Sequence, residues 1–259
     1  MNDLEKEILK RIDVSRSKRY ITNCYSLDVV NGSSGMWTEG DDFVFSYLDH
    51  GVMRLVYFVE DWSFLDKLLE KIEGGRFYLE FLTRNPSEYV PSYFSIVARM
   101  KRLSNSDCRT VFDADSPLLK YKNVVSVQSA RYDDAEEINE ILWTTFRTEI
   151  SHLLSIDEVR KRIESSQFFI HKDNRGGIDA LLQADVLPRK FYINQIVNRA
   201  GKEVIHSLLL NRLEKYVSEG GRYLYAWVQD SNIPSLKFHE KYGMKHDGMW
   251  SMIYSLERT

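Results

Sequence analysis

The residues of this chain that could take part in chemistry are histidines and carboxylates, and their spacing does not indicate a metal site. The two cysteines, Cys24 and Cys108, lie far apart, and the six histidines are scattered without a CxxC or HExxH pattern. We therefore expect no bound metal. Acid–base chemistry remains, and it needs a histidine or a carboxylate within reach of the reacting atoms. Side chains of this kind include His239, Asp185, Glu149 and His152.

The chain is long enough for two domains and apolar enough to build a core in each. It has 259 residues, of which 43% are hydrophobic and 13% aromatic, and this composition argues against disorder. Polar residues at 101–123 separate the two halves. We expect a smaller N-terminal α/β domain over residues 1–120 and a second domain over residues 121–259.

Charge and hydropathy argue against two classes of partner. The chain has 35 basic and 38 acidic residues, so its net charge of −3 gives no overall reason to bind nucleic acid. Its first residues alternate charged and apolar side chains, unlike a secretory signal, and no run approaches the roughly 20 apolar residues of a membrane span. We expect a soluble cytoplasmic protein with no nucleic-acid or membrane partner.

The N-terminal half has the pattern of an α/β segment. Apolar residues at helical spacing predict helices within residues 1–20 and at 65–72, and Asp49-His50-Gly51 between two β-rich runs predicts a hairpin. Residues 76–84 are expected to form a strand. Residues 86–100 are expected to form a short helix and a further segment.

The C-terminal half alternates strands and helices. Asp133-Asp134 is expected to cap one helix, and Ser155 with Glu158 forms a capping-box pattern at the start of the next. A long helix ending at Gly220-Gly221 and a short helix ending at Gly243 follow. Strands are expected at 124–130, as a hairpin at 167–186, and at 191–198, 222–229 and 249–256.

The two halves share an internal similarity. The segment EKIEGGRFYLEFLTRNPSEYVPSYF at 70–94 parallels EKYVSEGGRYLYAWVQDSNIPSLKF at 214–238. Each reads as a helix tail, a Gly-Gly stop, an Arg-aromatic strand, and an Asn and a Pro before a final Phe. Either the halves arose by duplication, or two ordinary α/β units share a common stop signal.

The order of predicted elements across 124–257 resembles the GNAT acetyltransferase superfamily. The most specific segment, Asn232 to Met244, is similar to that family's fourth-helix signature, with a small residue three after the Asn and a Gly before a large apolar residue. The resemblance implies an α/β (α+β) fold with a mixed central sheet flanked by helices. The N-terminal half resembles the family more loosely, as a shortened and degenerate copy.

The resemblance also implies a cosubstrate, acetyl-CoA. In this superfamily two parallel strands splay apart, and the pantetheine arm pairs with the exposed backbone like an added strand. Here that backbone would belong to Ile196, Val197 and Asn198. The next helix would point its N-terminus, at Gly201 and Lys202, toward the pyrophosphate, and Asn232 would lie near the cosubstrate as well as capping its own helix.

The turn before that helix departs from the family pattern. The family has Arg/Gln-x-x-Gly-x-Gly/Ala, whereas residues 198–205 read NRAGKEVI and keep one glycine at most at the critical positions. Glu203 would repel a pyrophosphate, and Arg199 and Lys202 could offset it.

The acid–base candidates acquire roles through the same resemblance. His239 stands where the family often has a tyrosine that protonates the leaving thiolate, and the alternative is a buried histidine held by hydrogen bonds. Asp185 is a candidate base for the acceptor amine. Glu149 and His152 fall between the first two helices, which the family uses as a substrate loop, and for all three the alternative is solvated surface.

Two functions are therefore open. The first is an N-acetyltransferase that moves an acetyl group from acetyl-CoA to an amine of a small molecule or peptide, and the Asn232–Met244 signature favours it. The second is a non-catalytic GNAT-like binding module with a decayed CoA site, which the altered turn favours. A homodimer is left open for either.

Overall fold

The computed structural model describes residues 1–15, 18–24, 26–91 and 93–258. The chain divides into two compact units. Unit 1 comprises Met1–Arg99, Thr148–His152 and Met249–Thr259, and unit 2 comprises Met100–Arg147 and Leu153–Gly248. Residues 100–120, which the sequence places in the N-terminal domain, thus group with unit 2.

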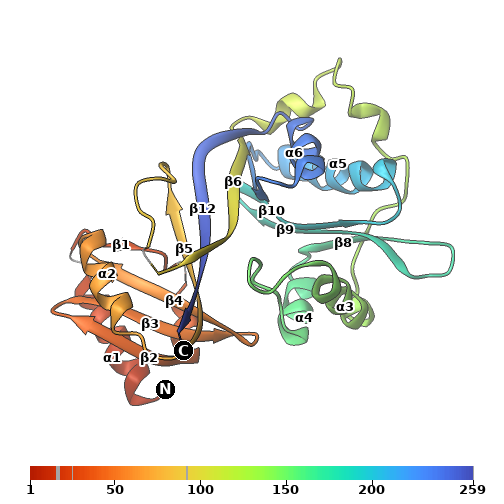
Figure 1. Ribbon diagram of the computed structural model, residues 1–259. Coiled ribbons are helices and arrows are strands. Elements are labelled where there is room, and N and C mark those ends of the chain that lie inside the picture. Colours follow the sequence, from red (N-terminus) through yellow and green to blue (C-terminus); the bar gives the residue numbers. More distant parts are fainter. Residues whose placement is uncertain (16–17, 25, 92, 259) are drawn as a thin grey trace. The chain divides into compact units, whose positions relative to one another are not determined.

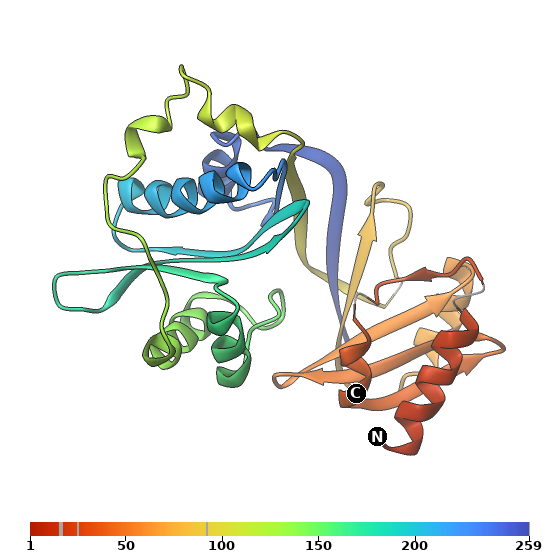
Figure 2. The ribbon, with the colours of Figure 1, turned by 180° about the vertical axis from the view of Figure 1, so that it is seen from behind.

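Unit 1 is a sheet with one helix on each face (Figures 1 and 2). Its sheet runs in the order β2-β3-β4-β5. Ile8 and Ile12 of α1 pack against the face that carries Phe43, and the leucines of α2 pack against the opposite face. The elements are α1 (Asp3–Ser15), β1 (Ile21–Thr22), a 3₁₀ turn (Leu27–Gly32), β2 (Ser33–Glu39), β3 (Asp42–Asp49), β4 (Val52–Val59), α2 (Trp62–Glu70) and β5 (Gly75–Thr83).

Unit 2 is a mixed sheet between two helical layers (Figure 1). Its strands follow the order β7-β8-β9-β10-β11-β6. Helix α5 covers one face, and helices α3 and α4 cover the other. The elements are three 3₁₀ turns (Cys108–Phe112, Leu119–Tyr121, Tyr132–Asp134), β7 (Gln128–Ser129), α3 (Ala135–Thr145), α4 (Ile156–Glu164), β8 (Phe168–Lys172), β9 (Ile178–Leu187), β10 (Lys190–Asn198), α5 (Lys202–Ser218), β11 (Tyr223–Gln229) and α6 (Ile233–Glu240). Two strands belong to both units: β6 (Ser95–Asn105) enters unit 2 at Met100, and β12 (Lys245–Arg258) belongs to unit 1 from Met249 on.

Most local predictions from the sequence are confirmed. His50 and Gly51 join β3 to β4 with φ of 49° and 85°, as a tight two-residue hairpin requires. The Ser155–Glu158 capping box is present, with the Glu158 carboxylate accepting from the Ser155 backbone N–H at 2.7 Å. The predicted α/β class with a mixed sheet flanked by helices is also confirmed.

Two local predictions are wrong. The strand expected at 124–130 is only the two-residue β7, and the short helix expected within 86–100 is absent from the described residues there. That region instead leads into β6, whose last residues, Met100–Asn105, pair antiparallel with β11. Pairing with a distant strand decides the structure of this polar segment, and local composition cannot reveal it.

The two units repeat one motif. In each, an antiparallel hairpin is followed by a helix and then by a strand parallel to the second hairpin strand: β3-β4-α2-β5 in unit 1 and β9-β10-α5-β11 in unit 2. On its other edge β5 pairs with β12, and β11 pairs with β6. Within the similar segments at 70–94 and 214–238, the strands β5 and β11 therefore occupy equivalent positions, whereas α6 has no helical counterpart among the described residues after β5. Each motif is completed by a strand from the other half of the chain.

In both motifs the parallel strands separate after a few residues. Pairing of β4 with β5 covers only Met53–Leu55, although β4 continues to Val59. Pairing of β10 with β11 covers Lys190–Ile193, although β10 continues to Asn198. Beyond these points, the facing backbone groups need other partners.

Unit 1 fills its gap with its own chain. Strand β1 pairs with Phe58 and Val59 of β4, on the edge that β3 leaves free. The amide of buried Asn23 then bridges the two diverging strands: it donates to the carbonyls of Leu55 and Glu80, both at 3.0 Å, and accepts from the Tyr57 N–H at 3.0 Å.

Unit 2 has no equivalent insert among its described residues. A bulge interrupts β10 between Ile193 and Gln195, and residues 195–198 pair with β9 on one edge. No described strand pairs with them on the edge that faces β11. Both units thus contain a gap between two diverging parallel strands. In unit 1 β1 and Asn23 fill this gap, and in unit 2 no described strand does.

Replacing Asn23 with Ala should destabilise unit 1. The variant leaves two carbonyls and one N–H without their bridging partner, and unsatisfied buried groups cost about 1–3 kcal/mol each, so we expect a loss of about 3 kcal/mol or more. Asn85→Ala, at an exposed turn residue, should cost less than about 0.5 kcal/mol. Urea unfolding followed by a unit 1 signal measures both, and equal midpoints for the two variants would contradict this role of Asn23.

Candidate functional site

The N-terminus of α5 follows directly on the unpaired part of β10. Gly201 precedes the helix with φ of 111°, and no side chain caps the first turn. The Gly201 N–H itself donates to the Asn198 side chain at 3.2 Å. The next backbone N–H groups and the helix dipole therefore present positive partial charge, a suitable site for a pyrophosphate.

One carboxylate opposes an anion at this position. A Cβ atom on Gly201 would lie 3.7 Å from Oε2 of Glu203, so the Glu203 side chain folds back over the start of the helix. Lys202 Nζ lies 3.9 Å from Oε1 of the same carboxylate and partly neutralises it. The backbone fits a phosphate, while Glu203 weakens the fit.

Helix α6 has the ends that the sequence predicts. The Asn232 side chain accepts from the Ser235 N–H at 3.1 Å, which confirms it as the N-cap. Gly243 ends the helical segment at φ of 68°. The Asn105 side chain donates to the neighbouring Tyr242 carbonyl at 2.9 Å, so the turn is held from β6.

His239 lies on α6 and is only 4% exposed. Its Nδ1 lies 2.7 Å from the Ser235 carbonyl, which can only accept, so Nδ1 carries the hydrogen. Burial lowers the pKa of the imidazole, so the ring is neutral near pH 7. Nε2 is then a bare acceptor, and it is buried without a hydrogen-bond partner among the described residues.

Asp185 is half-buried at the end of β9. Its Oδ1 accepts from Arg162 at 2.9 Å, and the same guanidinium nitrogen donates to Gln167 at 3.0 Å. The carboxylate is therefore held in place by an ion pair. Its role as the base for an amine stays a prediction.

The two predicted substrate-loop residues belong to unit 1. The Arg54 guanidinium, 6% exposed, donates to the Thr148 carbonyl at 2.6 Å and to Asp49 at 2.6 Å. His152 is exposed and places Nδ1 2.8 Å from Oδ2 of Asp49, the same oxygen that accepts from Arg54. Burial raises the pKa of Asp49, but His152 and Arg54 together bring it below its usual range. The Glu149 carbonyl accepts weakly from Arg54, at 3.5 Å.

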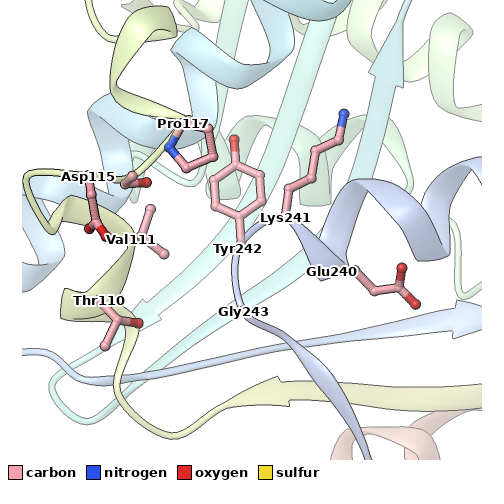
Figure 3. A pocket seen from close by; sticks show the side chains of 9 residues that line it. Thr110, Val111, Asp115, Pro117, Glu240, Lys241, Tyr242 and Gly243 are labelled. Carbon is pink, nitrogen blue, oxygen red and sulfur yellow. The ribbon is translucent and has the colours of Figure 1, made fainter.

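A cavity of about 280 Å³ lies at the C-terminal end of α6 (Figure 3). None of the site residues predicted from the sequence lines it. Its lining includes Thr110, Asp115, Pro117, Glu240, Lys241 and Tyr242. Within the described ranges, no helix is long and apolar enough to cross a membrane, and no three His, Cys, Asp or Glu side chains cluster as metal ligands.

Some structurally important polar residues were missed in the sequence. Arg54 and Gln183 each interrupt an apolar strand at a buried position, and that interruption is a usable signal. The sequence gives no such signal for Asn23, because the two carbonyls to which its side chain donates lie 32 and 57 residues away. Its importance depends wholly on tertiary structure.

Comparison with known proteins identifies the fold. No protein-family model and no curated protein matches the chain. A GCN5-related N-acetyltransferase from Sphaerobacter thermophilus matches at a TM-score of 0.59 and 10% identity, over 83% of this chain and 76% of the other. A tandem GNAT protein from the clavulanic acid biosynthesis pathway matches at 0.58 and 13%, over 99% and 96%. Saccharomyces cerevisiae N-myristoyltransferase, with bound myristoyl-CoA, matches at 0.51 and 10%, over 98% and 78%.

The chain therefore has the fold of the GNAT superfamily, as its resemblance in sequence predicts. The match to a tandem GNAT protein covers both halves, in agreement with the repeated motif.

Lowering the pH should destabilise the core beneath α5 through His206. This residue is 1% exposed, bonds the Tyr242 hydroxyl at 2.8 Å and stacks on Tyr121 and Phe238. Burial, helped by the charge of Lys241, lowers its pKa from 6.5 to about 4. The unfolded chain then binds the proton more tightly, so stability falls as pH drops from about 6.5 to about 4, by up to about 3 kcal/mol.

Urea unfolding at several pH values between 4 and 7 measures this loss. His206→Phe keeps the ring stack and removes the titration, so its stability should depend less on pH. His246→Gln, at an exposed histidine, should leave the dependence as in the parent. A His206→Phe profile as steep as the parent profile would assign the loss to other groups.

Proposed function

We propose that unit 2 binds an acyl-CoA, acetyl-CoA in the first instance, between β10 and β11 and transfers its acyl group to an amine. The observation that carries this proposal is the unpaired edge of residues 195–198, followed directly by the uncapped N-terminus of α5. An extended chain of amides ending in a pyrophosphate complements these two features in that order.

The fold supports the same proposal. Two of the matched structures are described as an N-acetyltransferase and an N-myristoyltransferase with bound myristoyl-CoA. We assign the backbone of Ile196, Val197 and Asn198 to the pantetheine arm, and Gly201 with Lys202 to the phosphates. Asn232 would border the cosubstrate from the start of α6. The acceptor is an amine of a small molecule or peptide.

The neutral state of His239 suits a proton relay. When an amine attacks a thioester, the nitrogen acquires a surplus proton and the leaving thiolate needs one. A bare Nε2 can receive the first proton and return it to sulfur. The imidazolium formed in between carries its charge in a buried site, so burial favours passing the proton on to the thiolate. Asp185 remains the candidate for the initial deprotonation of the acceptor.

A second function rests on Glu203. A carboxylate over the helix N-terminus takes the place of a phosphate, and this favours a non-catalytic module with a decayed CoA site. Calorimetric titration with acetyl-CoA separates the two. We expect one site per chain, because β1 and Asn23 fill the gap of unit 1. No heat and no rise in melting temperature at millimolar acetyl-CoA would favour the module.

Replacing Glu203 with Gln should strengthen acetyl-CoA binding. The substitution removes one negative charge next to the proposed pyrophosphate site, and we expect about two- to tenfold tighter binding at low salt. Glu219→Gln, beyond the other end of the same helix, is the matched control and should leave the affinity unchanged. Calorimetry measures both, and equal effects would place the phosphates elsewhere.

Replacing His239 with Ala should slow acyl transfer without loosening the cosubstrate. Acid–base assistance contributes about 10²–10⁴-fold and water can replace part of it, so we expect kcat to fall about 10–1,000-fold. The acetyl-CoA affinity should stay within about threefold of the parent value. His239→Tyr should retain much of the activity. An Ala variant that turns over at the parent rate would make His239 a packing residue.

A further inference from the structure

Two buried amide oxygens lie side by side in the sheet of unit 2. Gln183 on β9 is 3% exposed, Gln195 on β10 is 9% exposed, and the two residues are direct partners in the strand register. The Oε1 atom of each is buried and has no hydrogen-bond partner among the described residues. Buried carbonyl oxygens of this kind are rarely left without a donor.

The pair faces away from α5. Gln183 lies between Leu182 and Ala184, which both pack in the core beneath α5, so its own side chain points to the opposite face. Gln195 follows the bulge and shares its face with Val197, which packs with α3 and α4. Both amides therefore lie on the face of the sheet opposite to the helix assigned to the phosphates.

The pair also lies where the gap begins. The last parallel partners of β10 and β11 are Ile193 and Ala226, and Gln195 is the first residue after the bulge. An acyl group at the end of a pantetheine arm in this gap would come next to these amides. Because both free atoms are uncharged acceptors, the missing partner is a donor.

The surroundings add a charge and an aromatic surface on the same face. Asp185 lies two residues after Gln183 and is the register partner of Tyr192. The ring of Tyr192 stacks on that of Tyr225, with centroids 4.6 Å apart and an angle of 8° between planes. Both rings are half-exposed.

We propose that Gln183 and Gln195 form the acceptor subsite and select a primary amine. The proposal rests on the acyl transfer proposed above. A neutral primary amine has two N–H groups and one lone pair. If Oε1 of each glutamine accepts one N–H, the lone pair is left for the acyl carbon.

Every bond, electron pair and proton is accounted for in the reaction at this subsite. The nitrogen forms a bond to the acyl carbon, the carbon–sulfur bond breaks with its electron pair on sulfur, and the surplus proton of the nitrogen passes to that sulfur. The two glutamines position the nitrogen and exchange no proton.

The pair distinguishes acceptor substrates by the number of hydrogen-bond donors on the reacting atom. A secondary amine has one N–H and an alcohol one O–H, so either leaves one buried oxygen unsatisfied. A buried acceptor that loses its partner weakens binding by about ten- to a hundredfold. The subsite should therefore reject N-methylated amines and alcohols of the same shape.

Phenethylamine, N-methylphenethylamine and 2-phenylethanol are matched probes, with a phenyl ring suited to Tyr192 and Tyr225. Binding is read from the side-chain amide NMR signals of Gln183 and Gln195 in the full chain, assigned by their loss in Gln→Leu variants. Transfer is read from thiol release with acetyl-CoA. We expect phenethylamine alone to shift both signals and to be acylated.

Variants of the two glutamines separate an effect on the position of the acceptor from an effect on the stability of the fold. Gln183→Leu and Gln195→Leu remove an unpartnered buried oxygen, so both should fold at least as stably as the parent. Each should raise KM for phenethylamine about ten- to a hundredfold, with acetyl-CoA affinity unchanged. Gln195→Glu should hold the ammonium form and move the pH–rate profile upward. Gln128→Leu, at an exposed residue of β7, should change none of these.

Three results would overturn the subsite. The first is that no probe shifts either amide signal at millimolar concentration. The second is that the secondary amine or the alcohol binds as well as phenethylamine. The third is that both Leu variants keep the parent KM, which would assign the pair to buried water. Acetyl-CoA calorimetry on the same samples tests the acyl-transfer proposal separately from the subsite proposal.

Discussion

When two parallel strands diverge, the backbone groups that face each other lose their partners, and the rest of this structure depends on how those groups are satisfied. A buried N–H or C=O without a partner costs about 1–3 kcal/mol, so a gap of several residues cannot stay empty at no cost. Unit 1 inserts β1 and the Asn23 amide. Unit 2 has no such insert among its described residues and is the half in which a ligand would be useful.

The same constraint explains the connection of the two motifs. Strand β5 diverges from its parallel partner β4, and β11 diverges from its parallel partner β10. Each of the two therefore needs a neighbour on its other edge. The neighbour of β5 is β12, from the end of the chain, and the neighbour of β11 is β6, from its middle. Because each motif takes its closing strand from the other half, neither half has a complete sheet by itself. This reciprocity agrees with a duplicated origin of the similar segments at 70–94 and 214–238.

Sequence reasoning succeeds where structure is decided locally. Helix periodicity, the Ser155–Glu158 capping box and the tight turn at His50-Gly51 each involve residues within one turn or hairpin, and each is found. It fails for β6, whose polar residues form a strand by pairing with distant parts of the chain, β11 among them. The candidate site follows the same division. The N-cap Asn232 is readable from the sequence, whereas the tautomer of His239 and the pairing of Gln183 with Gln195 require the packed structure.

The distribution of unsatisfied polar atoms connects the constraint to function. Seven buried side-chain atoms lack a partner among the described residues, and four of them belong to Gln183, Asn194, Gln195 and His239. Three of these four residues lie at the bulge where β10 leaves β11, and the fourth lies on the helix that follows β11. Unit 1, whose gap is filled, contributes only the Tyr20 hydroxyl. The other two, the Nε atoms of Arg160 and Arg212, lie on α4 and α5. The cost of the unsatisfied atoms at the bulge is recovered if a bound partner supplies their hydrogen bonds. The unfilled gap and the polar atoms around it are thus the two observations on which the proposed binding site rests.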